Sequence, residues 1–182
     1  MTSPLRALTA AATAALLLTL AACASGPSTT TAEPTTSAAA SAPAADGECD
    51  GVTVVVDASA FGDADETSLS ECVQTDGPIA AVDAFTQVDV ETEGTVEYGD
   101  QVVCRVNGVP AEDVALTSAE GAEHFETCES MPAAFAYWSL WVKPEAGEWG
   151  YAQEGLSTLE LQPGESVALL FTLNGEPAAP TS

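Results

Sequence analysis

Five cysteines are the residues of this chain whose chemistry can be predicted from their positions. The first, Cys23, directly follows Leu20-Ala21-Ala22 at the end of an apolar segment that starts after Arg6. This arrangement is typical of a bacterial lipoprotein signal, in which the cysteine thiol receives a diacylglyceryl group and becomes the first mature residue. Two acyl chains are enough to anchor a protein stably to a membrane. An ordinary secretory signal cleaved at Ala21 and Ala22 is the alternative.

The other four cysteines predict two disulfides, because an even number of cysteines in an exported domain is usually a disulfide framework. These residues are Cys49, Cys72, Cys104 and Cys128. Three pairings are possible, and we favour Cys49–Cys72 with Cys104–Cys128, which closes two local loops. A zinc site is disfavoured, since the chain has no Cys-x-x-Cys pair and His124 is its only histidine.

Aromatic residues near the C-terminus are the candidates for ligand binding. In the segment 136–143 (AYWSLWVK), strand alternation places Tyr137 and Trp141 on one face and Trp138 on the other with the core. Trp149 and Tyr151 follow on the return segment. A surface formed by Tyr137, Trp141, Trp149 and Tyr151 would suit a flat ring, because aromatic faces combine apolar area with polar tips. The alternative is that these rings build the core.

The remaining polar residues do not form a catalytic constellation. His124 stands alone in an acidic stretch, and no serine lies in a Gly-x-Ser-x-Gly motif. Close pairs of acids such as Asp63 and Asp65 are expected by chance among 28 acidic residues. We therefore expect a protein that is not an enzyme and has no metal site and no resident cofactor.

Charge and composition divide the chain and limit its partners. We expect a signal peptide at 1–22, a lipidated cysteine with a disordered Ala/Ser/Thr/Pro tether at 23–47, a folded domain at 48–175 and a tail at 176–182. The chain has 28 acidic residues against Arg6, Arg105 and Lys143. Nucleic acid is excluded as a partner, because phosphate contacts need clustered Lys and Arg.

The apolar pattern of the domain predicts an α+β fold. Alternating or β-branched runs predict strands at 52–58, 67–73, 88–96, 101–107, 136–143, 148–152, 156–161 and 166–173. Pro78, with Ile79, Val82 and Phe85 at helical spacing, predicts the main short helix. A second short helix is expected over 117–127. Asn107-Gly108 predicts a tight turn. We expect a small antiparallel sheet with one main short helix, braced by disulfides.

The order of several motifs resembles the transcobalamin-like C-terminal domain family, in its bacterial secreted and lipoprotein members. These motifs are VTVVVD at 52–57, VVCRVNGVPA at 102–111, AYWSLW at 136–141, EWGYAQEG at 148–155 and the turn Pro163-Gly164. The resemblance implies a β-grasp-like α+β domain. It also implies binding of a cobalamin-type or other flat ligand, because in transcobalamin and intrinsic factor this domain closes over cobalamin.

Two functions follow as expectations. The first is a cell-surface lipoprotein, anchored outside the cytoplasmic membrane, whose single domain binds a small molecule as a non-catalytic accessory to uptake. Its ligand would be a corrinoid or another flat molecule. The second is a protein–protein interaction module of the cell envelope with no small-molecule ligand. The partner would then be an envelope protein or a transporter.

Overall fold

The computed structural model describes residues 49–61, 67–175 and 179–180. The predicted signal peptide, Cys23, the tether and most of the predicted tail lie outside these residues. No helix in the described ranges is long and apolar enough to cross a membrane.

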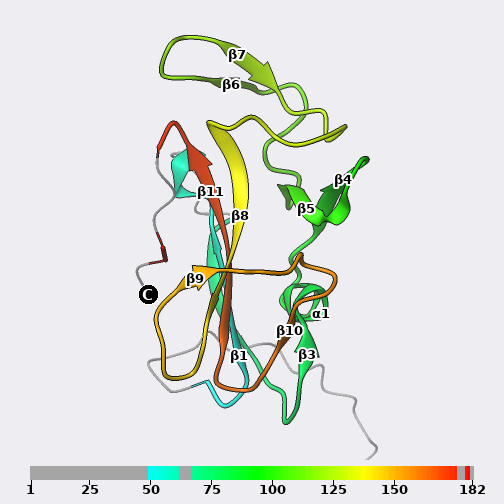
Figure 1. The fold of residues 1–182 in the computed structure, drawn as a ribbon, viewed down its shortest axis with the longest axis vertical. Coiled ribbons are helices and arrows are strands. Elements are labelled where there is room, and N and C mark those ends of the chain that lie inside the picture. The colour runs from blue at the N-terminus through cyan, green and yellow to red at the C-terminus, as the bar shows by residue number, and fades with distance from the viewer. Residues whose placement is uncertain (1–48, 62–66, 176–178, 181–182) are drawn as a thin grey trace, which may run out of the picture. The chain divides into compact units, whose positions relative to one another are not determined.

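A five-stranded sheet organises the domain (Figure 1). Its strands, in spatial order, are β2 (Leu69–Val73), β1 (Val52–Asp57), β11 (Ser166–Leu173), β8 (Ala136–Lys143) and β9 (Gly150–Tyr151). All neighbouring strands are antiparallel except β1 and β11, which pair in parallel at Val54–Val167 and adjacent positions. The first and last strands therefore lie side by side in the middle of the sheet, which agrees with a β-grasp-like order.

The described residues also form three small two-stranded sheets. They are β4 (Thr92–Thr95) with β5 (Gly99–Val106), β6 (Ala115–Thr117) with β7 (Glu123–Phe125), and β3 (Ile79–Ala80) with β10 (Glu160–Leu161). A short 3-10 helix, η1, covers Ser59–Phe61, and α1 (Ala81–Gln87) is the single α-helix in the described part of the chain. The predicted α+β class with a mostly antiparallel sheet and one main helix is confirmed.

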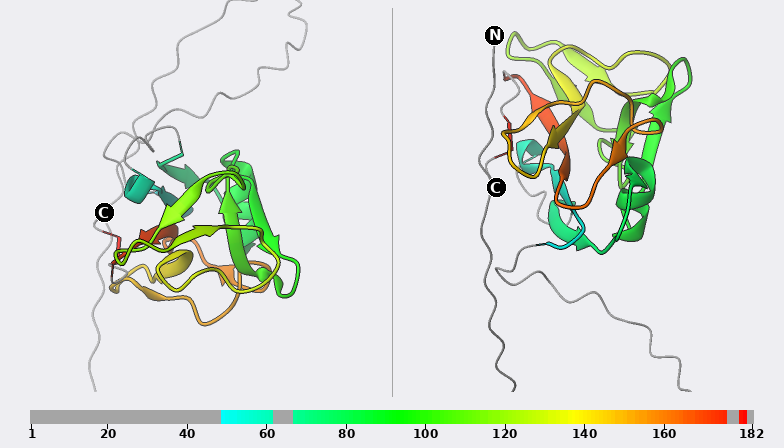
Figure 2. Two further views of the ribbon diagram at one scale, coloured as in Figure 1. Left: turned by 90° about the horizontal axis from the view of Figure 1, so that it is seen from above. Right: turned by 60° about the horizontal axis from the view of Figure 1, so that its bottom comes forward.

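The larger core lies between the five-stranded sheet and α1. Figures 1 and 2 place α1 and the β4–β5 pair on the same side of the sheet. Val54 and Leu169 project from the sheet toward Phe85 of α1, and all three side chains are fully buried. Burial of such apolar side chains stabilises the fold by about 1.5–3 kcal/mol each. The helix is short, so this packing and not intrinsic propensity holds it.

A smaller apolar cluster lies on the opposite face of the same sheet. It consists of Val55, Trp141, Ala168 and Leu170, with Trp149 packed against it. Val54 and Val55 are neighbours in β1 but belong to different clusters, as the period of two in a strand requires. The central strands are thus apolar on both faces, which explains their continuous Val and Leu runs.

Two disulfides brace the domain, with the pairing that we favoured. Cys49–Cys72 connects the segment before β1 to β2, and Cys104–Cys128 connects β5 to the segment after β7. The disulfides indicate an oxidising environment outside the cytoplasm.

The predicted helix over 117–127 is wrong, because this segment forms most of the β6–β7 hairpin. Gly121 adopts φ +87°, and its N–H donates to the Ser118 carbonyl, which turns the chain back. The Asn174 amide then fixes the hairpin by donating to the Thr117 carbonyl (2.7 Å) and accepting from the Ala119 N–H (2.8 Å). Such a distant contact leaves no local signal in the sequence.

The main helix begins at Ala81, three residues later than Pro78 suggested. Ile79 and Ala80 instead form β3, which pairs with Leu161 and Glu160 of β10. The Ala81 N–H donates to the Leu159 carbonyl at 2.9 Å, so the entry to the helix is fixed by the residue just before β10, far away in the sequence.

Candidate functional site

A groove of about 520 Å³ lies between β5 and β8, and we call it the β5–β8 groove. Its lining is mainly apolar and includes Val103, Met131, Tyr137, Trp138, Leu140 and Leu156. The segment 131–134 and the loop 151–156 form the remaining walls. A volume of this size and an apolar lining with a few polar tips are typical of ligand sites.

Trp138 is fixed in the lining by contacts from two other parts of the chain. Its indole N–H donates to the Val109 carbonyl at 2.9 Å. Its ring meets Phe171 of β11 edge-on, with ring centroids 5.3 Å apart. Val109 is itself held by paired backbone hydrogen bonds to Val106 across the Asn107-Gly108 turn. Asn107 and Gly108 have φ of 49° and 74°, so the predicted tight turn is confirmed.

The loop 151–156 is held against both strands that border the groove. The Ala152 N–H donates to the Leu140 carbonyl of β8 at 3.0 Å. On the other side, the Gln101 amide of β5 donates to the Ser157 hydroxyl at 3.1 Å. Gly155 lies so close to Gln101 that a Cβ atom would be 2.7 Å from its Cα, which only glycine avoids.

The four aromatic candidates do not form one surface, although Tyr151 stacks on Trp141. Tyr137 and Tyr151 line the β5–β8 groove, and Tyr151 is 47% exposed. Trp141 is only 6% exposed and belongs to the smaller cluster on the other face of the sheet. Trp149 packs against that cluster, with the Lys143 ammonium 5.8 Å from its ring centroid.

Residues that the sequence analysis did not single out contribute more to the groove than the two tryptophans do. Trp138 was assigned to the core, and the structure places it both in the core and in the groove lining. Val103, Met131 and Leu156 reach the groove from segments that are far apart in the chain. The alternation in β8 puts Tyr137 and Trp138 on opposite faces, so it does not predict that both line the groove.

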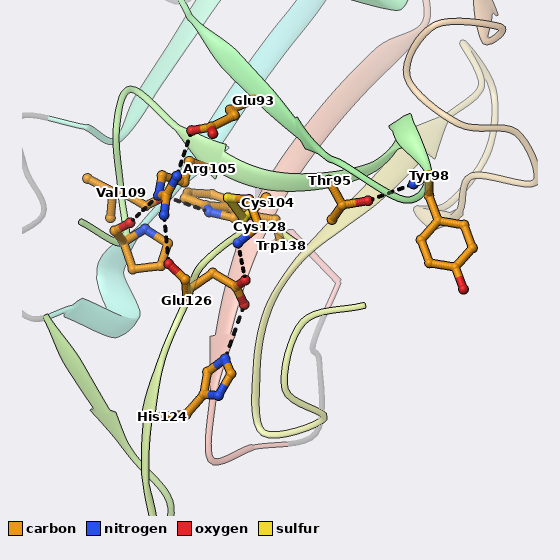
Figure 3. Close-up of a disulfide and its surroundings, with 11 residues drawn as sticks. Glu93, Thr95, Tyr98, Cys104, Arg105, Val109, His124, Glu126, Cys128 and Trp138 are labelled. Carbon is orange, nitrogen blue, oxygen red and sulfur yellow. Dashed lines mark hydrogen bonds and ion pairs between the residues drawn. A yellow bond between two sulfur atoms is a disulfide. The ribbon is translucent and has the colours of Figure 1, made fainter. Parts of the chain in front are cut away.

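Arg105 connects three segments beside the Cys104–Cys128 disulfide (Figure 3). Its guanidinium donates to the Pro110 carbonyl at 2.9 Å and to the Glu126 carbonyl at 2.6 Å. A third bond, of 2.8 Å, reaches the Glu93 carboxylate. The five donors of a guanidinium in fixed directions make this connection possible. Arg105 therefore has a structural role.

Glu126 is a buried acid next to the same disulfide (Figure 3). One carboxylate oxygen accepts the Cys128 N–H at 2.8 Å, and the other lies 3.3 Å from His124 Nε2. The ligand atoms of Cys104, Glu126 and Cys128 lie within 4.8 Å of one another. Both sulfurs are joined in the disulfide, however, and thiolates are the form that binds metal.

A second, polar groove of about 990 Å³ lies beside β4. Asp89, Glu91, Glu93 and Asp100 line it together with Arg105. Nearby on the β4–β5 turn, a side-chain hydrogen bond with Glu97 and the charge of that residue raise the pKa of exposed Tyr98 above 10.0. The acids would attract cations, but their contacts give no further indication of a ligand.

Comparison of the chain with known protein families, with curated proteins and with solved structures found no match. The geometry of the β5–β8 groove is therefore the basis for assigning a function.

Proposed function

We propose that this protein is a lipid-anchored binding protein of the cell envelope, whose β5–β8 groove holds a small apolar molecule as an accessory to uptake. The observation that supports this proposal best is the groove itself. Its volume of about 520 Å³ lies within the range of about 300–1,000 Å³ for ligand sites. Cys23 carries the lipid in this proposal, and its thioether-linked acyl chains hold the domain outside the cytoplasmic membrane.

The groove favours a flat, mostly apolar ligand. Tyr137 and Tyr151 present ring faces and hydroxyl groups, while Trp138, Leu140 and Leu156 present apolar surface. A corrinoid or another flat molecule fits this chemistry, in line with the resemblance to the transcobalamin-like C-terminal domain family. The site in this proposal uses Tyr137 and Tyr151 of the aromatic candidates, because Trp141 is covered.

The lining supports binding without catalysis. Among the described residues that line the groove, the ionisable side chains are Tyr137, Tyr151 and Glu154. No general base is placed next to a nucleophile there, which is the arrangement that covalent or acid–base catalysis needs. We therefore assign the protein a capture function and no enzymatic activity.

Titration of the full chain with cobinamide and cobalamin, followed by calorimetry, tests this proposal. We expect saturable binding that Ala134→Trp weakens at least tenfold, because exposed Ala134 lines the groove and an indole there would fill it. Ala111→Trp is the matched control, since Ala111 is also exposed and lies outside the groove lining. Absence of heat with both corrinoids would exclude corrinoids as ligands. Binding that Ala134→Trp leaves unchanged would exclude the groove.

The second candidate function is an envelope protein–protein interaction module. The burial of Trp141 favours it, because a covered ring cannot serve as a stacking surface for a small flat ligand. The part of the β8 edge that has no neighbouring strand borders the groove and also favours it.

A further inference from the structure

The outer edge of β8 is paired along only part of its length. On its inner side, β8 pairs with β11 from Ala136 to Lys143 without interruption. On its outer side, β9 pairs only with Trp141 and Val142. Beyond β9, a single hydrogen bond joins the Ala152 N–H to the Leu140 carbonyl. The segment 136–140 thus has no strand beside its outer edge in the described part of the chain.

The direction of the backbone groups on this edge follows from the Ala152–Leu140 hydrogen bond. In a strand, the N–H and C=O of one residue point to the same side, and alternate residues share that side. Because the Leu140 carbonyl points outward, the Leu140 N–H and both backbone groups of Trp138 do so too. Within the described residues, no backbone hydrogen bond joins these three groups to a neighbouring segment.

These unpaired groups border the apolar β5–β8 groove as well as solvent. Trp138, Ser139 and Leu140 all belong to the lining of the β5–β8 groove. Backbone donors and acceptors that are shielded from water cost free energy unless they are paired. An extended segment placed in the groove would satisfy them and bury apolar side chains at the same time.

We propose that the outer edge of β8 at Trp138–Leu140 binds an extended segment of an envelope protein by β-strand addition. This inference rests on the second candidate function. In this binding mode, main-chain hydrogen bonds provide affinity and alternate side chains provide specificity. One set of alternate side chains would face Trp138, Leu140 and Leu156, and the other set would face Tyr137.

Charge defines the chemistry of the partner segment. Glu154 is the one charged residue of the groove lining, and Glu148 joins it in an adjoining cavity of about 500 Å³. The whole chain has 28 acidic and 3 basic residues. A second copy of this chain would meet like charge, which opposes pairing of two β8 edges. The fitting segment is apolar at alternate positions and carries Lys or Arg at its ends.

The test uses the full chain in detergent and a fluorescent peptide with alternating Val and Thr at its centre and two lysines at each end. Versions with Leu or Phe in place of Val complete the panel. We expect anisotropy to show saturable binding by at least one peptide. Deuterium exchange of the segment 136–143 should slow on binding, since the Trp138 and Leu140 amides become hydrogen-bonded. Ala134→Trp should weaken binding at least tenfold, while Ala111→Trp should not.

Two peptide controls separate strand addition from other binding. N-methylation of alternate residues, made in both registers, removes main-chain donors without changing side chains, and one register should lose binding at least tenfold. Glutamates in place of the terminal lysines should also weaken binding at least tenfold at low salt, and less at high salt. Equal binding of both N-methylated peptides, or no binding by the whole panel, would overturn the proposal.

The same preparation, titrated with cobinamide, distinguishes this inference from the small-molecule function. Cobinamide binding without peptide binding would overturn strand addition and keep the capture function. Peptide binding without cobinamide binding would support strand addition and oppose a corrinoid ligand. Binding of neither would overturn strand addition and oppose a corrinoid ligand.

Discussion

Tyr151 stacks on Trp141, with ring centroids 4.0 Å apart and 25° between the ring planes. The two residues are direct cross-strand partners in β9 and β8. Trp141 is 6% exposed and Tyr151 is 47% exposed, so the tyrosine covers the tryptophan. Such cross-strand aromatic pairs stabilise a sheet beyond the effect of their buried area. In the β8–β9 hairpin, Tyr151 thus covers Trp141, and Tyr151 is the ring of this pair that is exposed.

Ser139→Ala should destabilise the domain by about 1–3 kcal/mol. The Ser139 hydroxyl accepts the Trp141 indole N–H at 2.9 Å and donates to the Leu170 carbonyl at 3.1 Å. All of these groups are buried, so the alanine would leave an indole N–H without a partner. Urea denaturation measures the change. Ser130→Ala, at an exposed serine, should change the free energy of unfolding by less than about 0.5 kcal/mol. Equal losses for the two variants would contradict this account.

Arg105→Lys should lower the free energy of unfolding by about 2–4 kcal/mol, although it keeps the charge. A lysine ammonium cannot reach the Pro110 carbonyl, the Glu126 carbonyl and the Glu93 carboxylate in the directions that the guanidinium serves. Glu93→Gln removes only the ion pair, in which the glutamate side chain is 55% exposed. Glu93→Gln should therefore lower the free energy of unfolding by about 1 kcal/mol or less. Thermal or urea denaturation of both variants gives the two losses of unfolding free energy. A larger loss for Glu93→Gln than for Arg105→Lys would assign the stability to the ion pair instead.

Removal of each disulfide should destabilise the domain by about 2–4 kcal/mol, since the linked cysteines are 23 and 24 residues apart. The Cys104→Ala, Cys128→Ala double variant should lose more than the Cys49→Ala, Cys72→Ala variant. Cys104 and Cys128 are buried, and their loss also leaves a cavity. Urea denaturation gives the two values. Mass mapping of peptides from the oxidised chain checks the pairing, and any peptide that joins Cys72 to Cys104 would contradict it.

If Cys23 carries the lipid, as we propose, Cys23→Ser should leave the protein in the aqueous phase when Triton X-114 solutions separate. The chain that keeps Cys23 should enter the detergent phase, because two acyl chains bind strongly to apolar surroundings. Mass spectrometry of the mature N-terminus should find a diacylglyceryl group on Cys23 and none in the variant. A mature chain that begins at Cys23 without lipid would support an ordinary secretory signal.

The sequence predicted the elements whose patterns are local. Val52–Asp57 and Ser166–Leu173 are β-branched or apolar runs, and both form central strands of the sheet. Asn107-Gly108 has the residues that a tight turn with two positive φ values requires. Pairing of neighbouring cysteines was favoured because local loops are simple to close. These features depend on residues that are adjacent or nearly adjacent in the chain.

The features that the sequence did not predict depend on distant contacts. The segment 117–127 was expected to be helical, but Asn174, near the far end of the domain, fixes it as a hairpin. The β5–β8 groove is assembled from β5, β8 and two loops, so no single segment carries its pattern. The alternation in β8 correctly separated Trp138 from Trp141, but it could not show that Tyr151 covers Trp141. Both faces of the sheet are buried, and alternation alone does not distinguish a buried second face from an exposed one.

The disulfide pairing has a consequence for how the protein matures. Each disulfide joins cysteines that follow one another in the chain, Cys49 with Cys72 and then Cys104 with Cys128. During export the chain emerges from its N-terminus onward, so each cysteine meets its native partner before the next pair arrives. If lipidation blocks the Cys23 thiol, an oxidase that joins the remaining cysteines in their order of emergence would produce both native bonds directly. Maturation of this domain would then need a thiol oxidant but no disulfide isomerase.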